Sequence, residues 1–125
     1  MKVAFDIDDT LWKIEKYECP IICLKQHDHN NFRQVPDYDL IAVLRWFANN
    51  GDEVFVWSAG GVDYAQTIVD RLGLTSLVTV IPKISSAKQL QKRYEGMDIA
   101  FDDCETNLAK VDVRVKRKYD ESTKT

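Results

Sequence analysis

One stretch near the start of the chain decides its fold, Val3-Ala4-Phe5-Asp6-Ile7-Asp8-Asp9-Thr10. Its three apolar residues lead into two aspartates spaced two residues apart, and side chains at that spacing share one face of an extended strand. We therefore expect Asp6 and Asp8 to project together from the carboxyl end of a buried strand. Burying paired carboxylates is unfavourable unless a cation or a proton compensates their charge. The pair is thus a candidate for a magnesium-dependent nucleophile with a neighbouring general acid/base.

Short apolar runs and amphipathic stretches alternate after this strand, which is typical of βαβ units around a parallel sheet. The pattern predicts strands at 3–7, 53–57, 77–81, 99–101 and 111–115, with helices opening near 36, 62 and 85. We therefore expect an α/β fold, with one domain over residues 1–115 and a polar tail at 116–125. Residues 13–34 show no sustained helical face and are predicted to form a short flap over the carboxylates.

Composition limits the partners and the compartment. The formal net charge is −3 and no broad basic block is present, so long nucleic acid is not an expected partner. The start of the chain predicts neither a secretory signal nor a membrane span. Three cysteines without secretory context indicate reduced thiols, and we expect a cytoplasmic protein.

Polar residues follow each of the next three predicted strands. Ser58 with Ala59-Gly60-Gly61 follows the second strand, Lys83 the third, and Asp102-Asp103 the fourth. The carboxyl ends of parallel strands meet at one edge of a sheet, where open α/β folds bind ligands. A hydroxyl, backbone amides at a helix start and a lysine together suit a phosphate, and flanking carboxylates suit Mg²⁺.

On these residues the chain resembles phosphatases of the haloacid dehalogenase (HAD) superfamily, and most closely their small capless magnesium-dependent members. The family's DxDxT motif matches Asp6–Thr10, its serine/threonine motif Ser58, its lysine motif Lys83, and its acidic motif Asp102-Asp103. The resemblance extends to further short segments of sequence, which are Thr10-Leu11-Trp12, Pro82-Lys83 with Leu90-Gln91, and Asp102-Asp103-Cys104-Glu105-Thr106-Asn107. One departure is Ala59-Gly60-Gly61, where several relatives place an arginine soon after the serine.

The resemblance implies a Rossmann-like three-layer sandwich with a central parallel sheet and a short flap in place of a cap domain. It also implies a phosphomonoester hydrolase that acts through an aspartyl-phosphate on a small molecule or on an exposed phosphate of a macromolecule. By this resemblance, Asp6 is the nucleophile, and Asp8 is the general acid and then the general base. Mg²⁺ would be held by Asp6, the Asp8 carbonyl and Asp102. Ser58, Ala59 and Lys83 would bind the phosphate, and Asp103 would support the site.

Several alternatives stay open. Lys88 competes with Lys83 for the phosphate, although Lys83 follows its strand directly. A catalytically silent binding domain and a phosphotransferase are the competing functions. Zinc ligands are also conceivable in the predicted flap, but their spacing matches no familiar zinc finger. The four residues concerned are Cys19, Cys23, His27 and His29.

Overall fold

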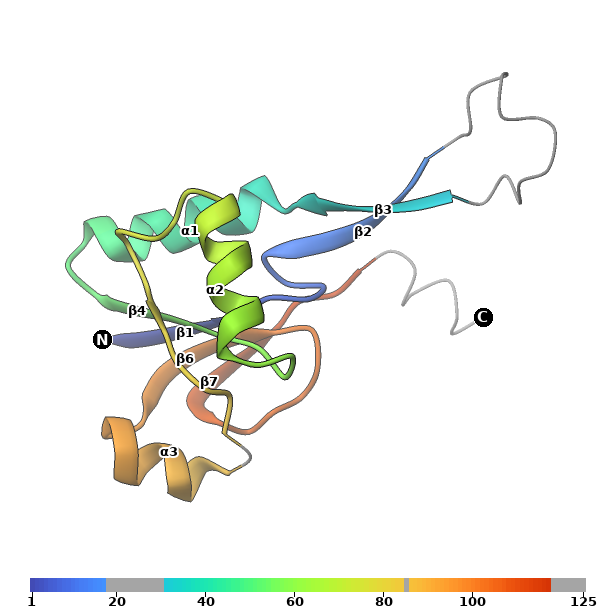
Figure 1. Cartoon of the computed structure of the whole chain (residues 1–125). Coiled ribbons are helices and arrows are strands. Elements are labelled where there is room, and N and C mark those ends of the chain that lie inside the picture. The colour runs from blue at the N-terminus through green and yellow to red at the C-terminus, as the bar shows by residue number, and fades with distance from the viewer. Residues whose placement is uncertain (18–30, 85, 118–125) are drawn as a thin grey trace, which may run out of the picture.

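The computed structural model describes residues 1–17, 31–84 and 86–117 (Figure 1). Its centre is a five-stranded sheet in the order β5-β4-β1-β6-β7, in which every neighbouring pair is parallel. The strands are β1 (Lys2–Asp6), β4 (Glu53–Trp57), β5 (Thr79–Val80), β6 (Met97–Asp102) and β7 (Ala109–Arg114). The predicted α/β fold with a parallel sheet is confirmed.

Helices cover both faces of this sheet (Figure 1). They are α1 (Tyr38–Asn49), α2 (Val62–Arg71) and α3 (Ala87–Tyr94). Alternation along β1 divides the core, because Val3 and Phe5 pack in the cluster that includes α1 and α2, whereas Ala4 packs in the cluster that includes Leu90 of α3. The central strand β1 is therefore buried on both sides, as strands inside all-parallel sheets usually are.

The two ends of the predicted flap are strands that pair with each other in an antiparallel arrangement. Strand β2 (Trp12–Tyr17) pairs with β3 (Asn31–Pro36), and the hairpin extends away from the sheet (Figure 1). Trp12 is buried at the base of the hairpin, and its indole N–H donates to the side-chain oxygen of Gln34. The four residues considered for zinc lie outside the described residues.

Some boundaries differ from the prediction, most clearly in the third strand. Only Thr79–Val80 is strand where 77–81 was expected. The Leu77 amide is used in a turn, bonded to the Leu74 carbonyl at 2.9 Å, so it cannot pair with β4. Within the predicted polar tail, the Arg117 side chain is largely buried and forms an ion pair with Asp37 of the domain. Among the described residues, no helix has the length and apolarity needed to cross a bilayer.

Candidate active site

A tight turn at the end of β1 separates the two predicted catalytic aspartates. Asp6 ends β1 and is buried, whereas Asp8 lies in the turn and is exposed. The chain folds back there, with the Trp12 amide donating to the Ile7 carbonyl at 3.1 Å. Asp9 adopts φ 60°, a left-handed conformation that aspartate tolerates better than most residues. The turn therefore places a buried and an exposed carboxylate at one end of the same strand.

A lysine joins two buried carboxylates from neighbouring strands. Lys83 Nζ lies 2.7 Å from Asp102 Oδ2, at the end of β6, and 3.3 Å from Asp6 Oδ1. The other oxygen of Asp6 accepts a hydrogen bond from the Thr10 hydroxyl at 3.5 Å, and Asp102 Oδ1 accepts one from the Cys104 amide at 3.0 Å. Three sequence-predicted residues, Asp6, Lys83 and Asp102, thus meet at the carboxyl edge of the sheet.

The charges of this group perturb one another. Burial, together with the Asp102 charge, raises the pKa of Asp6 to about 7, despite the opposing effect of Lys83. Burial alone would lower the pKa of Lys83, but its hydrogen bond and charge interactions with Asp102 and Asp6 outweigh burial and raise it. Burial and a hydrogen bond with Asp102 also raise the pKa of Asp103. One ammonium therefore does not fully compensate the carboxylates around it.

This donor set fits a hard divalent cation. Two buried carboxylates share one lysine, with the half-buried Asp103 beside Asp102, so the group carries excess negative charge. Ligand atoms of Asp102, Asp103 and Cys104 lie within 4.8 Å of one another. The Asp103 charge and burial raise the pKa of the Cys104 thiol, which disfavours the thiolate needed for metal binding. Oxygen donors therefore remain, and these are the ligands that Mg²⁺ prefers.

Ser58 directly follows the neighbouring strand β4 and is buried. Its hydroxyl oxygen accepts the Gly60 amide at 3.0 Å, which closes a tight turn before α2. Gly61 then adopts φ 102° as the cap of α2, a conformation that favours glycine. Ala59 lies exposed within this turn, in the predicted phosphate-binding loop.

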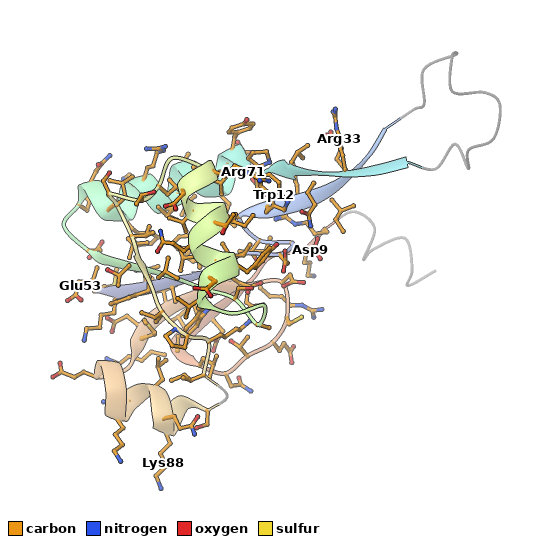
Figure 2. The ribbon with its side chains drawn as sticks, in the orientation of Figure 1. Asp9, Trp12, Arg33, Glu53, Arg71 and Lys88 are labelled. Carbon is orange, nitrogen blue, oxygen red and sulfur yellow. The ribbon has the colours of Figure 1, made fainter. Side chains whose placement is uncertain are left out.

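The two candidate lysines occupy different surroundings. Lys83 contacts the carboxylates, whereas Lys88 is exposed on α3 and points away from the sheet (Figure 2). The geometry therefore favours Lys83 over Lys88 for a role beside Asp6.

Two residues near the turn were not predicted. The Tyr64 hydroxyl donates to Asp8 Oδ1 at 2.6 Å, and burial with this hydrogen bond raises the pKa of Tyr64 to about 12. Arg117 donates to the carbonyls of Asp9 at 2.9 Å and Thr10 at 2.6 Å, and to Asp37 at 2.6 Å. The position of Tyr64 in the first turn of the helix after Ser58 was the available signal for it. Nothing near Arg117 in the sequence indicated its contacts.

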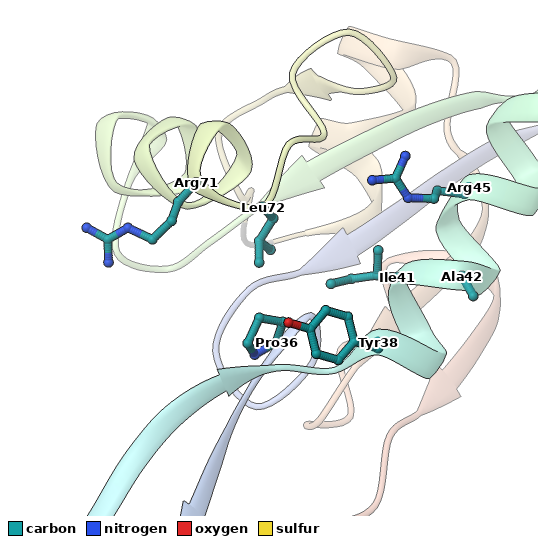
Figure 3. Close-up of a pocket in the computed structure, with 7 residues that line it drawn as sticks. All are labelled: Pro36, Tyr38, Ile41, Ala42, Arg45, Arg71 and Leu72. Atoms are coloured by element: carbon teal, nitrogen blue, oxygen red, sulfur yellow. The ribbon is translucent and has the colours of Figure 1, made fainter.

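A shallow cavity of about 270 Å³ lies between α1 and α2, apart from this set of residues. Figure 3 shows Ile41, Leu72 and Tyr38 around it, while the guanidinium of Arg71 points away. None of its lining residues belongs to the predicted catalytic set, so the candidate site remains the edge of the sheet.

Comparisons with family models, with curated proteins and with solved structures find no match to this chain.

Proposed function

We propose that this chain is a Mg²⁺-dependent phosphomonoester hydrolase, a Rossmann-like protein of the HAD type, that works through an aspartyl-phosphate at Asp6. The observation that carries the proposal is the Lys83 ammonium between Asp6 and Asp102, at 3.3 and 2.7 Å. Ser58 directly follows the adjacent strand β4, so a hydroxyl lies at the same edge of the sheet. A nucleophile, a fixed cation and a hydroxyl are the groups that phosphoryl transfer requires.

In the first step, a carboxylate oxygen of Asp6 attacks phosphorus as the bond to the leaving oxygen breaks. Both oxygens of Asp6 are held by long contacts, from Lys83 at 3.3 Å and Thr10 at 3.5 Å, which orient the carboxylate while leaving lone pairs for attack. Asp8 donates a proton to the leaving oxygen, so the product departs as a neutral alcohol. Lys83 and Ser58 hold the phosphoryl oxygens.

In the second step, Asp8 accepts a proton from water, whose oxygen attacks phosphorus. The bond to Asp6 breaks, the carboxylate is regenerated and inorganic phosphate leaves. Asp8 suits this exchange with solvent because it is exposed, whereas Asp6 is buried. Bound Mg²⁺, held by Asp6, the Asp8 carbonyl and Asp102, would offset the repulsion between the carboxylates and the phosphate.

The test is hydrolysis of p-nitrophenyl phosphate in the presence of Mg²⁺. We expect turnover by the wild type and trapping of Asp6 by beryllium fluoride, with both lost in Asp6→Asn because an amide is not a nucleophile. Asp39→Asn is the matched control, since Asp39 is an exposed aspartate on α1. Normal activity in Asp6→Asn contradicts the mechanism.

The competing functions give different outcomes in the same assay. A silent binding domain shows no turnover with Mg²⁺, Mn²⁺ or Co²⁺ on a broad panel of phosphate esters. A phosphotransferase forms the aspartyl-phosphate but passes it to an added alcohol acceptor in preference to water.

A further inference from the structure

Tyr64 links α2 to the exposed aspartate of the candidate site. It is the third residue of α2, and its ring is half-buried against the core cluster that α1 and α2 share. Its hydroxyl donates to Asp8 Oδ1 at 2.6 Å, at the short end of the range for such bonds. An anchored ring thus presents one hydroxyl to a side chain that is otherwise exposed to solvent.

The loop after β4 leaves room for this ring. A Cβ atom on Gly60 would lie 3.0 Å from Cδ2 of Tyr64 and 3.3 Å from Oγ of Ser58, closer than ordinary contacts. The ring therefore packs directly against the backbone of Gly60. The loop that carries Ser58 therefore also fixes the position of the Tyr64 ring, and both side chains lie on the same side of Gly60.

The contact distinguishes the two oxygens of Asp8. A protonated carboxyl has one O–H donor and one carbonyl oxygen that accepts. An oxygen that accepts the Tyr64 hydroxyl acts as the carbonyl oxygen, so the proton belongs on the other oxygen, Oδ2. Without this contact, the exposed carboxyl would rotate and carry its proton on either oxygen.

We propose that Tyr64 is a positioning residue that fixes the Asp8 carboxyl so that Oδ2 donates the proton to the leaving oxygen. The proposal rests on the proposed function, because it concerns the acid/base of the same site. In the first step, the O–H bond at Oδ2 breaks as the proton joins the leaving oxygen. In the second, Oδ2 receives a proton from the attacking water. Tyr64 keeps its own proton throughout and donates to Oδ1 in both states.

The test compares kcat/KM for two classes of ester in wild type and Tyr64→Phe, which keeps the ring and removes the hydroxyl. Alkyl phosphates need protonation of their leaving oxygen, whereas p-nitrophenolate leaves without it. We expect Tyr64→Phe to lower kcat/KM for an alkyl phosphate about tenfold, a part of what general acid catalysis supplies. For p-nitrophenyl phosphate, the change should stay within about twofold on the same reasoning. Tyr38→Phe, on an exposed tyrosine of α1, is the control.

A second comparison asks whether Tyr64 acts through Asp8. In an Asp8→Asn background, Tyr64→Phe should leave the rate of phosphoenzyme formation from the alkyl phosphate unchanged, because no carboxyl proton remains to be placed. Melting temperatures of all variants report whether the fold is kept.

The outcomes separate the two proposals. If the wild type hydrolyses both esters and Tyr64→Phe lowers both equally, or neither, the Tyr64 proposal is wrong and the proposed function stands. An effect of Tyr64→Phe that persists in the Asp8→Asn background also overturns the Tyr64 proposal. If the wild type hydrolyses no phosphate ester, the proposed function fails and the Tyr64 proposal fails with it.

Discussion

Replacing Arg117 with alanine should destabilise the protein by about 3 kcal/mol, although this residue lies 108 positions from the turn that it contacts. Its guanidinium donates to Asp9 O, Thr10 O and Asp37 Oδ2. The side chains of Arg117 and Asp37 are each 11% exposed, so the pair is largely shielded from water. One side chain therefore joins the carboxyl end of the described chain, the turn after β1 and the start of α1.

The magnitude follows from what the truncation leaves behind. Removing one partner of a buried ion pair typically costs about 3–5 kcal/mol, because the other charge stays buried. Asp37 keeps one hydrogen bond, from the Leu40 amide at 3.0 Å, so we expect the lower end of that range. For a chain of this size, the loss corresponds to a fall in melting temperature of roughly 10 °C. Arg117→Lys should lose about half as much, because one ammonium cannot contact all three acceptors.

Urea denaturation followed by circular dichroism measures these losses. Lys116→Ala is the matched control, since Lys116 is the exposed cation that directly precedes Arg117. This substitution should change the free energy of unfolding by less than about 0.5 kcal/mol. The cost of Arg117→Ala should shrink in an Asp37→Asn background, where no buried charge is left unpaired. A loss below about 0.5 kcal/mol for Arg117→Ala, or full additivity with Asp37→Asn, would refute this reasoning.

Three further predictions follow from the site and from Asp37. At a Mg²⁺ concentration about 100 times Kd, the wild type should gain about 2.7 kcal/mol of stability by fluorimetric melting, and Asp102→Asn should lose most of that gain. Lys83→Ala should lower kcat by about 10²–10³-fold, as for loss of a group that stabilises transition-state charge, while Lys88→Ala stays within about twofold in the same steady-state assay. Burial favours protonation of Asp37, but hydrogen bonds from Arg117 and Leu40 hold its pKa below the ordinary value. A carboxyl group whose pKa is lower in the folded protein than in the unfolded chain stabilises the fold at pH values above its unfolded-state pKa, which is about 4. This stabilisation is lost as the pH falls through the folded-state pKa. Urea denaturation at pH 7 and pH 3 should therefore show a smaller difference between wild type and Arg117→Ala in acid.

The sheet could be predicted because its strands are decided locally. Glu53–Trp57 is a strand where the sequence indicated one, since four consecutive buried residues are bounded by polar ones. Burial on both faces makes such a run nearly continuous in apolar character, which is the clearest signal a parallel strand offers. The strand predicted at 77–81 is present but shorter than expected, because β5 is an edge strand with one partner and a turn takes the Leu77 amide.

The meeting of Asp6, Lys83 and Asp102 was also predictable, although no local pattern contains it. Each residue follows an apolar run, and the parallel arrangement of those runs brings their ends to one edge. The prediction used the topological rule that the carboxyl ends of parallel strands share one edge of the sheet, and it used no distance between side chains. That rule gives the edge on which a side chain lies, and it does not give the contact that the side chain makes there.

Tyr64 and Arg117 show where that rule stops. Both act on the turn after β1, Tyr64 through the Asp8 carboxylate and Arg117 through the carbonyls of Asp9 and Thr10. Asp9 is held there at φ 60°, a conformation that costs free energy and persists when surrounding contacts stabilise it. Those contacts come from residues 56 and 108 positions away in the chain. The sequence of the turn therefore marks the candidate site, while its geometry depends on two distant side chains whose contacts only the folded arrangement reveals.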